Sequence, residues 1–270
     1  MSARHSIGII YPGHAAEGDY PAFERAYAEA TREDVGAPEL RLPVTISTIG
    51  VDEHTPEALL ETGSAPRLQE AAQRMLVEHP GPDAPQAMMW ACTSGSFVYG
   101  WEGAQRQAEN LAEVSGVPSS STSIAFAHAI EALQLSRVAV AATYPPDLAE
   151  HFRQFLARSG AEVVSFAPAN IFTAGEVGHL GLEEILAMAR AADTGHAEAV
   201  LIPDTAMHSL LWIRELEAAL GKPVLTANQV TVWEGLRIGS GPSASPWRAP
   251  IPLLGALGST WPAGVAQRSA

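Results

Sequence analysis

Short apolar runs alternate with longer segments of helical periodicity along most of the chain. The runs are rich in β-branched and small apolar residues and stop at Pro, Gly, Ser, Thr or Asp, which is typical of buried strands. Pro43 puts the second run at a sheet edge, since proline cannot donate to a ladder. The predicted strands cover residues 6–11, 40–49, 86–92, 137–142, 162–166, 199–203 and 223–226.

The segments between these strands place apolar side chains three and four positions apart, as one face of a helix requires. Residues 51–64 are predicted to form a loop with room for one helical turn, and the Gly-, Pro- and Ser-rich residues 240–270 an irregular tail that wraps the body or joins a subunit contact. The predicted helices cover residues 20–31, 65–79, 98–114, 124–135, 182–192, 209–220 and 229–236, with another ending near residue 159.

Strands that alternate with helices predict an α/β fold with seven to eight parallel strands. The pattern restarts after Pro118, so the chain divides into two comparable halves. We expect a first α/β domain of residues 1–117 plus 224–270, and a second of residues 118–223. One strand of each half ends in a polar turn, at Cys92-Thr93 and at Asp204-Thr205. This suggests a duplication whose two turns face each other across a cleft.

Cys92 is the only cysteine of the chain, and it follows the apolar run Met88–Ala91 directly. In open parallel sheets, ligands bind at the carboxyl ends of the strands. A thiol there, next to hydroxyl side chains and free backbone N–H groups, suits a nucleophile or an acid/base group that acts on an anion. The alternative is a small core cysteine, because free cysteines are often buried.

Composition narrows the class of partner. The 270 residues include 16 basic and 30 acidic ones, a net charge of −14, and no cluster of Lys or Arg. We therefore expect no nucleic acid and no membrane partner. No apolar stretch reaches the ~20 residues that span a bilayer, and the first residues lead into a strand without a signal peptide. With a lone thiol, which fits a reducing compartment, this predicts a cytoplasmic protein.

The sequence also argues against bound groups. A single cysteine excludes an internal disulfide and a multi-cysteine metal site. No glycine-rich dinucleotide fingerprint or phosphate loop follows any predicted strand. His and acidic residues are not grouped at metal-ligand spacing. We expect neither a metal nor a cofactor.

The stretch Cys92–Phe97, Thr122-Ser123, Thr143-Tyr144 and the turn after Ile202 fall in an order and at spacings that resemble the aspartate/glutamate racemase superfamily. The similarity spans residues 6–239 and is nearest to the branch of maleate cis–trans isomerase and arylmalonate decarboxylase. It implies a cofactor-free enzyme with two pseudo-symmetric flavodoxin-like domains, each offering one functional residue to the cleft between them. We also expect a homo-oligomer.

The resemblance implies roles for particular residues. Cys92 is the expected catalytic residue of the first domain. Asn170 is matched to an asparagine that contacts a second carboxylate. From the residues alone, Thr122 and Ser123 are equally well explained as helix N-caps. The residues expected to hold a substrate carboxylate are Thr93, Ser94, Thr122, Ser123 and Tyr144.

Two departures from the family matter. The second-domain cysteine is absent, and Asp204 takes its place, with Thr205 the weaker candidate. In the first loop, where Ser-Asn is common, this chain has Gly13-His14. His14 is a candidate acid/base group in the cleft or a surface histidine. Asp204 is a candidate acid/base or the cap of a helix near His208.

These residues favour a maleate-isomerase-like isomerase of a small (di)carboxylic acid, with Cys92 as nucleophile and Asp204 as acid/base. A decarboxylase of arylmalonate type and a non-catalytic carboxylate-binding protein are the alternatives. Racemisation ranks lower, because Cys and Asp have ill-matched reference pKa values of about 8.5 and 3.9. An ionised Asp204 beside a substrate carboxylate costs on the order of 1–4 kcal/mol, so the substrate is not necessarily maleate.

Overall fold

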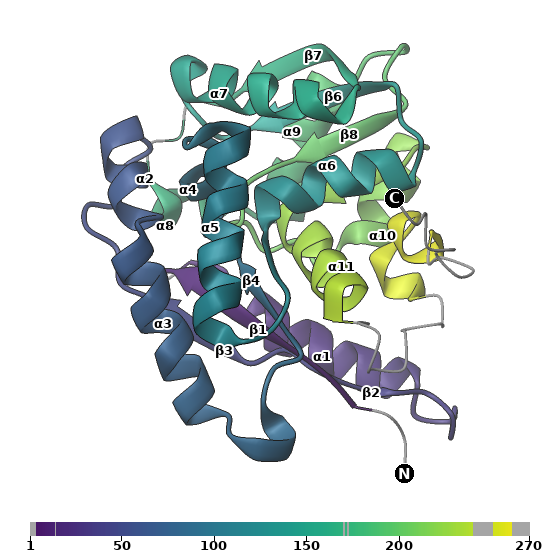
Figure 1. Cartoon of the computed structure of the whole chain (residues 1–270). Helices are drawn as coiled ribbons and strands as arrows, with labels where there is room; N and C mark the ends of the chain where they lie inside the picture. The colour runs from purple at the N-terminus through teal and green to yellow at the C-terminus, as the bar shows by residue number, and fades with distance from the viewer. Residues whose placement is uncertain (1–3, 14, 170, 172, 240–250, 261–270) are drawn as a thin grey trace, which may run out of the picture.

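The computed structural model describes residues 4–13, 15–169, 171, 173–239 and 251–260. Two parallel sheets lie one above the other in Figure 1, the N-terminal sheet below and the second sheet above. The α/β class with two parallel sheets flanked by helices is confirmed. In the first sheet the strand order is β2-β1-β4-β5, with β3 also paired to β1. Its strands are β1 (Arg4–Pro12), β2 (Glu39–Arg41), β3 (Val44–Ser47), β4 (Ala87–Trp90) and β5 (Ser119–Ser121).

The second sheet has the order β7-β6-β8-β9, and all its pairings are parallel. Its strands are β6 (Arg137–Ala142), β7 (Glu162–Pro168), β8 (Ala199–Ile202) and β9 (Val224–Thr226). Every residue of β4 and β8 is buried. Their unbroken apolar character follows from helices on both faces of a parallel sheet.

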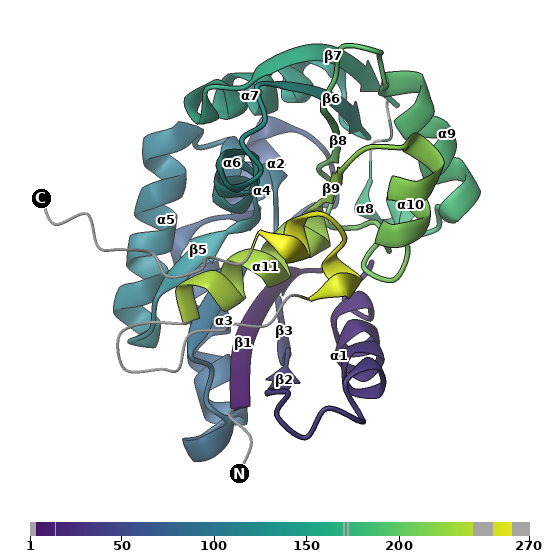
Figure 2. The ribbon, with the colours of Figure 1, turned by 90° about the vertical axis from the view of Figure 1, so that its right-hand side faces the viewer.

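Helices cover both sheets. Figure 2 shows α5 and α1 on opposite sides of the first sheet, and α9 packs on the second sheet through β6, β7 and β8. Helix α11 contacts strands of both sheets and lies along α6. The helices are α1 (Asp19–Ala30), α2 (Pro56–Thr62), α3 (Ala65–Glu78), α4 (Ser94–Phe97), α5 (Gly100–Ser115), α6 (Thr122–Ala132), α7 (Pro146–Leu156), α8 (Ala174–Val177), α9 (Leu182–Ala192), α10 (Ile213–Leu220) and α11 (Ala227–Gly239).

Apolar packing joins the two halves. The largest buried cluster combines side chains of both sheets. Phe97 of α4 lies with its ring centroid 5.3 Å from that of Phe152 on α7 and 5.5 Å from that of Tyr144. The short helix that follows Cys92 is thereby pressed against the second half.

Several elements differ from the sequence prediction, which had no counterpart of α4 or α8. Residues 119–121, to which the pattern assigned neither strand nor helix, form strand β5, because their backbone pairs with Met88–Trp90 of β4. Residues 56–62 form the 7-residue helix α2, longer than the single turn for which the prediction left room, with Thr55 accepting the Ala58 N–H at its start. The predicted strand 40–49 is divided into β2 and β3 around Pro43, and α10 begins at Ile213, four residues later than predicted.

Of the predicted tail, residues 251–260 are described. They form two 3-10 turns, Pro252–Leu254 and Leu257–Ser259, that contact α10 and α11. The amide of Gln229 donates to the Leu254 carbonyl at 2.9 Å, so this part of the tail packs on the body as expected. Within the described part of the chain, no helix is both long enough and apolar enough to cross a membrane.

Candidate active site

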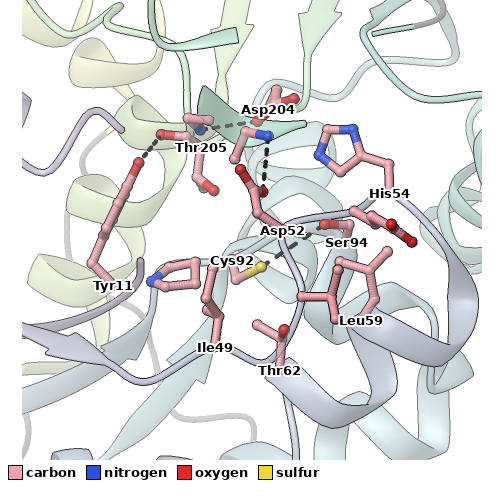
Figure 3. Close-up of a pocket in the computed structure, with 15 residues that line it drawn as sticks. Tyr11, Ile49, Asp52, His54, Leu59, Thr62, Cys92, Ser94, Asp204 and Thr205 are labelled. Carbon is pink, nitrogen blue, oxygen red and sulfur yellow. Dashed lines mark hydrogen bonds between the residues drawn. The ribbon is translucent and has the colours of Figure 1, made fainter. Parts of the chain in front are cut away.

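A cavity opens where the carboxyl ends of β1, β4 and β8 meet, which is the edge at which α/β sheets bind ligands. The free space between its lining atoms, including solvent at the open mouth, is about 470 Å³. Figure 3 shows Cys92 on one side and Asp204 on the other. The lining residues are Tyr11, Pro12, Ile49, Val51, Asp52, Glu53, His54, Leu59, Thr62, Cys92, Ser94, Ala174, Asp204, Thr205 and Ala206.

Cys92 is 5% exposed and lies two residues beyond β4. The Gly95 N–H donates to its sulfur at 3.2 Å, and the Ser94 hydroxyl lies 3.9 Å from the sulfur. Burial raises the pKa of the thiol to about 11, and the negative charge of Asp204 adds to this, while the Gly95 N–H acts in the opposite direction. The resting sulfur at neutral pH is therefore a thiol that needs a base before it can attack.

The turn around Cys92 depends on Gly95. A Cβ added there would lie 3.0 Å from the cysteine sulfur and 3.2 Å from the Trp90 indole. The Gly95 carbonyl accepts the Gln107 amide at 2.9 Å and the Trp90 indole N–H at 3.3 Å. Hydrogen bonds from α5 and β4 thus hold the backbone of this turn in place. Cys92 also packs in an apolar cluster with Trp90, so it is both a core residue and a cavity residue.

Asp204 lies two residues beyond β8 and is 4% exposed. One carboxylate oxygen accepts the Ala206 N–H at 2.9 Å, and the other accepts the Thr143 hydroxyl. This is an Asx turn that closes the loop after β8. The carboxylate does not cap α10, which begins nine residues later at Ile213, so the capping alternative is wrong.

Thr205, the weaker candidate, lines the same cavity. Its carbonyl accepts the Tyr11 hydroxyl at 3.0 Å, and that hydroxyl accepts the Ala16 N–H at 2.9 Å. The end of β1 therefore holds the Asp204 turn in place from the first half. Of the sequence-predicted site residues that the structure describes, it brings together Cys92, Ser94, Asp204 and Thr205 around one cavity.

Four further predicted binding residues that the structure describes are buried and are not among the lining residues: Thr93, Thr122, Ser123 and Tyr144. The Thr122 hydroxyl is 2.7 Å from that of Thr231, and the Ser123 hydroxyl donates to the Thr93 carbonyl at 2.7 Å. The Tyr144 hydroxyl donates to the carbonyl before Asp204. These hydroxyls, like the buried Thr93 side chain, do not line the cavity. Here they hydrogen-bond to the turns around the cavity, and their expected contact with a substrate stays a prediction.

The capping alternative for Thr122 and Ser123 is also wrong, because the side chain that caps α6 is Ser121, which accepts the Ile124 N–H. His14 and Asn170, the remaining predicted site residues, lie outside the described residues. Their expected contacts remain predictions.

The sequence prediction missed His54 and Asp52, which come from the segment between β3 and α2. His54 is 7% exposed, its Nδ1 lies 2.9 Å from the Ile171 carbonyl, and its ring meets the edge of Tyr144 at 5.4 Å between centroids. Asp52 accepts the Ala174 and Gly175 N–H groups. One signal was available: this segment follows a predicted strand and leaves the sheet at the edge that carries Cys92.

Charge in the cavity is predominantly negative. Asp52, Glu53 and Asp204 line it, and no lysine or arginine is among the described lining residues. His54 is the lining side chain that can become a cation. No group of three or more His, Cys, Asp or Glu within the described ranges is arranged to hold a metal ion. The lining itself thus offers proton-transfer and thiol chemistry.

The architecture is that of a two-sheet α/β protein with its site between the strand ends of two similar halves. A family model for arylmalonate decarboxylase matches residues 65–246, which is 182 of the 270 residues. The chain therefore belongs to the arylmalonate decarboxylase family, a family of enzymes within the aspartate/glutamate racemase superfamily. A search of curated proteins found no significant match.

Solved structures share the fold at low identity. A maleate isomerase variant from Pseudomonas putida S16 with maleate has a TM-score of 0.77 at 22% identity, covering 95% of this chain and 98% of that one. A Nocardia farcinica maleate cis–trans isomerase mutant with a covalently bound succinylcysteine intermediate has a TM-score of 0.71 at 23% identity, covering 90% and 97%. A mutant of arylmalonate decarboxylase in its liganded form has a TM-score of 0.69 at 22% identity, covering 90% and 96%.

Proposed function

We propose that the protein is a cofactor-independent isomerase that interconverts the cis and trans forms of a small unsaturated carboxylic acid, with Cys92 as nucleophile and Asp204 as acid/base. The supporting observation is the placement of the lone thiol and Asp204 around one cavity at the junction of the two halves. Family membership and the fold shared with maleate isomerases agree with it.

The reaction begins with loss of the thiol proton to a base in the cavity. The sulfur then adds to one alkene carbon, and the π electrons move to the neighbouring carbon and its carboxylate. Rotation about the new single bond and expulsion of the sulfur give the trans product. The Gly95 N–H stabilises the thiolate before addition and after expulsion.

Asp204 exchanges a proton with the neighbouring carbon of the adduct. In this proposal Asp204 enters the reaction as the carboxylic acid, the form that can donate that proton. Addition to maleate followed by protonation at that carbon produces an S-succinyl group on cysteine. The succinylcysteine intermediate of the Nocardia farcinica enzyme is such an adduct. The same two steps are proposed for Cys92 and Asp204.

The test is conversion of maleate and its monomethyl ester by the purified protein, followed by proton NMR. We expect the trans isomer to form, and the monoester to be converted faster than the dianion, because the cavity lining contributes three carboxylates. We also expect the substrate to slow the reaction of Cys92 with iodoacetamide. Absence of trans product from both compounds would contradict the isomerase.

Decarboxylation of an arylmalonate-type acid is the second candidate. It is supported by the family model over residues 65–246 and by the protonated resting state of Cys92. Loss of carbon dioxide leaves an enediolate, and a neutral thiol is the form that donates a proton to it. Phenylmalonate is the probe. Release of carbon dioxide with formation of phenylacetate, and no isomerisation of maleate, selects this reaction over the first.

A further inference from the structure

His54 is placed as an acid/base group would be. It is buried, it lines the cavity that contains Cys92, and its ring points towards the middle of that cavity from the side opposite Tyr11 in Figure 3. A carbonyl oxygen only accepts hydrogen bonds, so the 2.9 Å contact with the Ile171 carbonyl assigns the hydrogen to Nδ1. In the neutral imidazole, Nε2 is then the unprotonated nitrogen.

The ring is held in this orientation by both halves of the chain. Its backbone belongs to the segment after β3, whereas Ile171 and Tyr144 belong to the second half. Asp52, two residues earlier, is bound to the first N–H groups of α8 at 3.1 and 3.3 Å. These contacts fix the position of Nε2 in the absence of substrate.

Cys92 needs a base, and the other candidates in the lining are weaker. The carboxylate oxygens of Asp204 accept hydrogen bonds from Ala206 and Thr143, and those of Asp52 accept from Ala174 and Gly175. A carboxylate is also a weaker base than an imidazole by about two to three pKa units in reference compounds. Tyr11 has its pKa raised by burial, and its hydroxyl donates to the Thr205 carbonyl.

We propose that His54 is the acid/base partner of Cys92: its Nε2 takes the thiol proton as the sulfur attacks, and returns the proton when the carbon–sulfur bond breaks. This proposal extends the proposed function, and the part of it that concerns catalysis rests on that function. The proton moves from sulfur to nitrogen, the sulfur electron pair forms the new bond, and both changes reverse on expulsion. The imidazolium also offsets the negative charges of Asp52, Glu53 and the bound carboxylate.

Alkylation of Cys92 by iodoacetamide tests this without any substrate. The second-order rate is measured from pH 5.5 to 10 for the wild type and for His54→Gln, which keeps an amide donor for the Ile171 carbonyl. We expect the wild-type rate to rise with pH at the acidic end of this range and then to level off, because it follows the fraction of the base that is unprotonated. The His54→Gln rate should increase about tenfold per pH unit throughout, and fall at least tenfold below the wild type at pH 7.5.

The matched control is His151→Gln on the exposed face of α7, which should reproduce the wild-type profile. Circular dichroism and the unfolding midpoint establish that His54→Gln is folded. The wild-type profile is informative even if the variant does not fold, because a single line of unit slope from pH 5.5 to 10 overturns the proposal. Superimposable wild-type and His54→Gln profiles overturn it as well.

Maleate turnover measured in parallel separates this proposal from the isomerase assignment. If His54→Gln alters the alkylation profile and the wild type isomerises neither maleate nor its monoester, the Cys92–His54 pair stands and the reaction is another one. If the wild type isomerises the substrate and His54→Gln does so at an unchanged kcat and KM, the isomerase stands and the pair is wrong.

Discussion

The turns after β4 and β8 occupy equivalent places in the two halves, yet they differ in how their chemical group is held. The sulfur of Cys92 accepts one N–H bond, from Gly95, and burial keeps it protonated. The carboxylate of Asp204 has both oxygens engaged, by Ala206 and Thr143. A duplicated scaffold has thus been given two unlike proton carriers, which suits a reaction with distinct nucleophile and acid/base steps better than a symmetric proton exchange.

The most damaging change to this pair is Cys92→Ser. A hydroxyl is far less nucleophilic and less acidic than a thiol, so we expect isomerisation to fall by more than ~10³-fold. Thr205 and Asp204 remain as they are, so binding of the substrate should persist within a few-fold, as measured by calorimetry. Retention of more than a tenth of the wild-type kcat would show that the reaction does not need the thiol.

Asp204→Asn separates two effects of Asp204: its proton transfer to the substrate and its charge, which raises the pKa of Cys92. The amide cannot exchange a proton, so turnover should fall by ~10²–10³-fold. The negative charge that raises the pKa of Cys92 is removed as well, so alkylation of the thiol at pH 8 should become faster by a few-fold. Stopped-flow alkylation and steady-state turnover measure the two effects separately. A decrease in both rates would mean that Asp204 acts on the position of the turn, not on proton transfer.

Gly95→Ala tests how closely the first turn is fitted to the sulfur. The new methyl group meets the Cys92 sulfur at 3.0 Å and the Trp90 ring at 3.2 Å, and such overpacking typically costs about 1–3 kcal/mol. Urea unfolding measures this loss, and alkylation should change by up to about tenfold as the N–H donor shifts. Gly18→Ala is the control, because a Cβ there has no neighbour within 4 Å. Equal stability of the two variants would contradict the tight fit.

The sequence predicts that the turns after β4 and β8 lie close together. It does not predict which other residues surround them. Apolar runs ending at Cys92 and Asp204 locate two strand ends, and parallel strands bring their carboxyl ends to one edge. Strand β5 has no apolar pattern of its own, and only pairing with Met88–Trp90 defines it. The direction of the Thr122 hydroxyl, towards Thr231, depends on the packing of α6 against α11.

The missed histidine illustrates the same limit. His54 reaches the cavity because Ile171, over a hundred residues away, accepts its hydrogen bond. No local pattern around residues 51–55 encodes that contact. The cap at Thr55 with Pro56 was visible and would have predicted α2, which ends the loop just beyond His54. That cap would have shortened the predicted loop and placed His54 directly before the first turn of α2.

The smallest expected effect concerns stability at alkaline pH. The pKa of Cys92 is raised from its ordinary value of 9.0 to about 11 in the folded protein, so the folded state keeps a proton that the unfolded state loses between these values. Stability from this group is complete below pH 9 and is lost as pH rises through 11. The wild type should therefore lose about 1 kcal/mol more stability than Cys92→Ala between pH 8 and 10. Urea titrations of both proteins measure this difference, and parallel curves would show that the sulfur is solvated when ionised, as an open cavity would permit. Asp204→Asn supplies a comparison. The difference in stability lost between pH 8 and 10 should be smaller between Asp204→Asn and the double mutant Asp204→Asn/Cys92→Ala than between the wild type and Cys92→Ala. The reason is that one of the two causes of the raised Cys92 pKa, the charge of Asp204, has been removed.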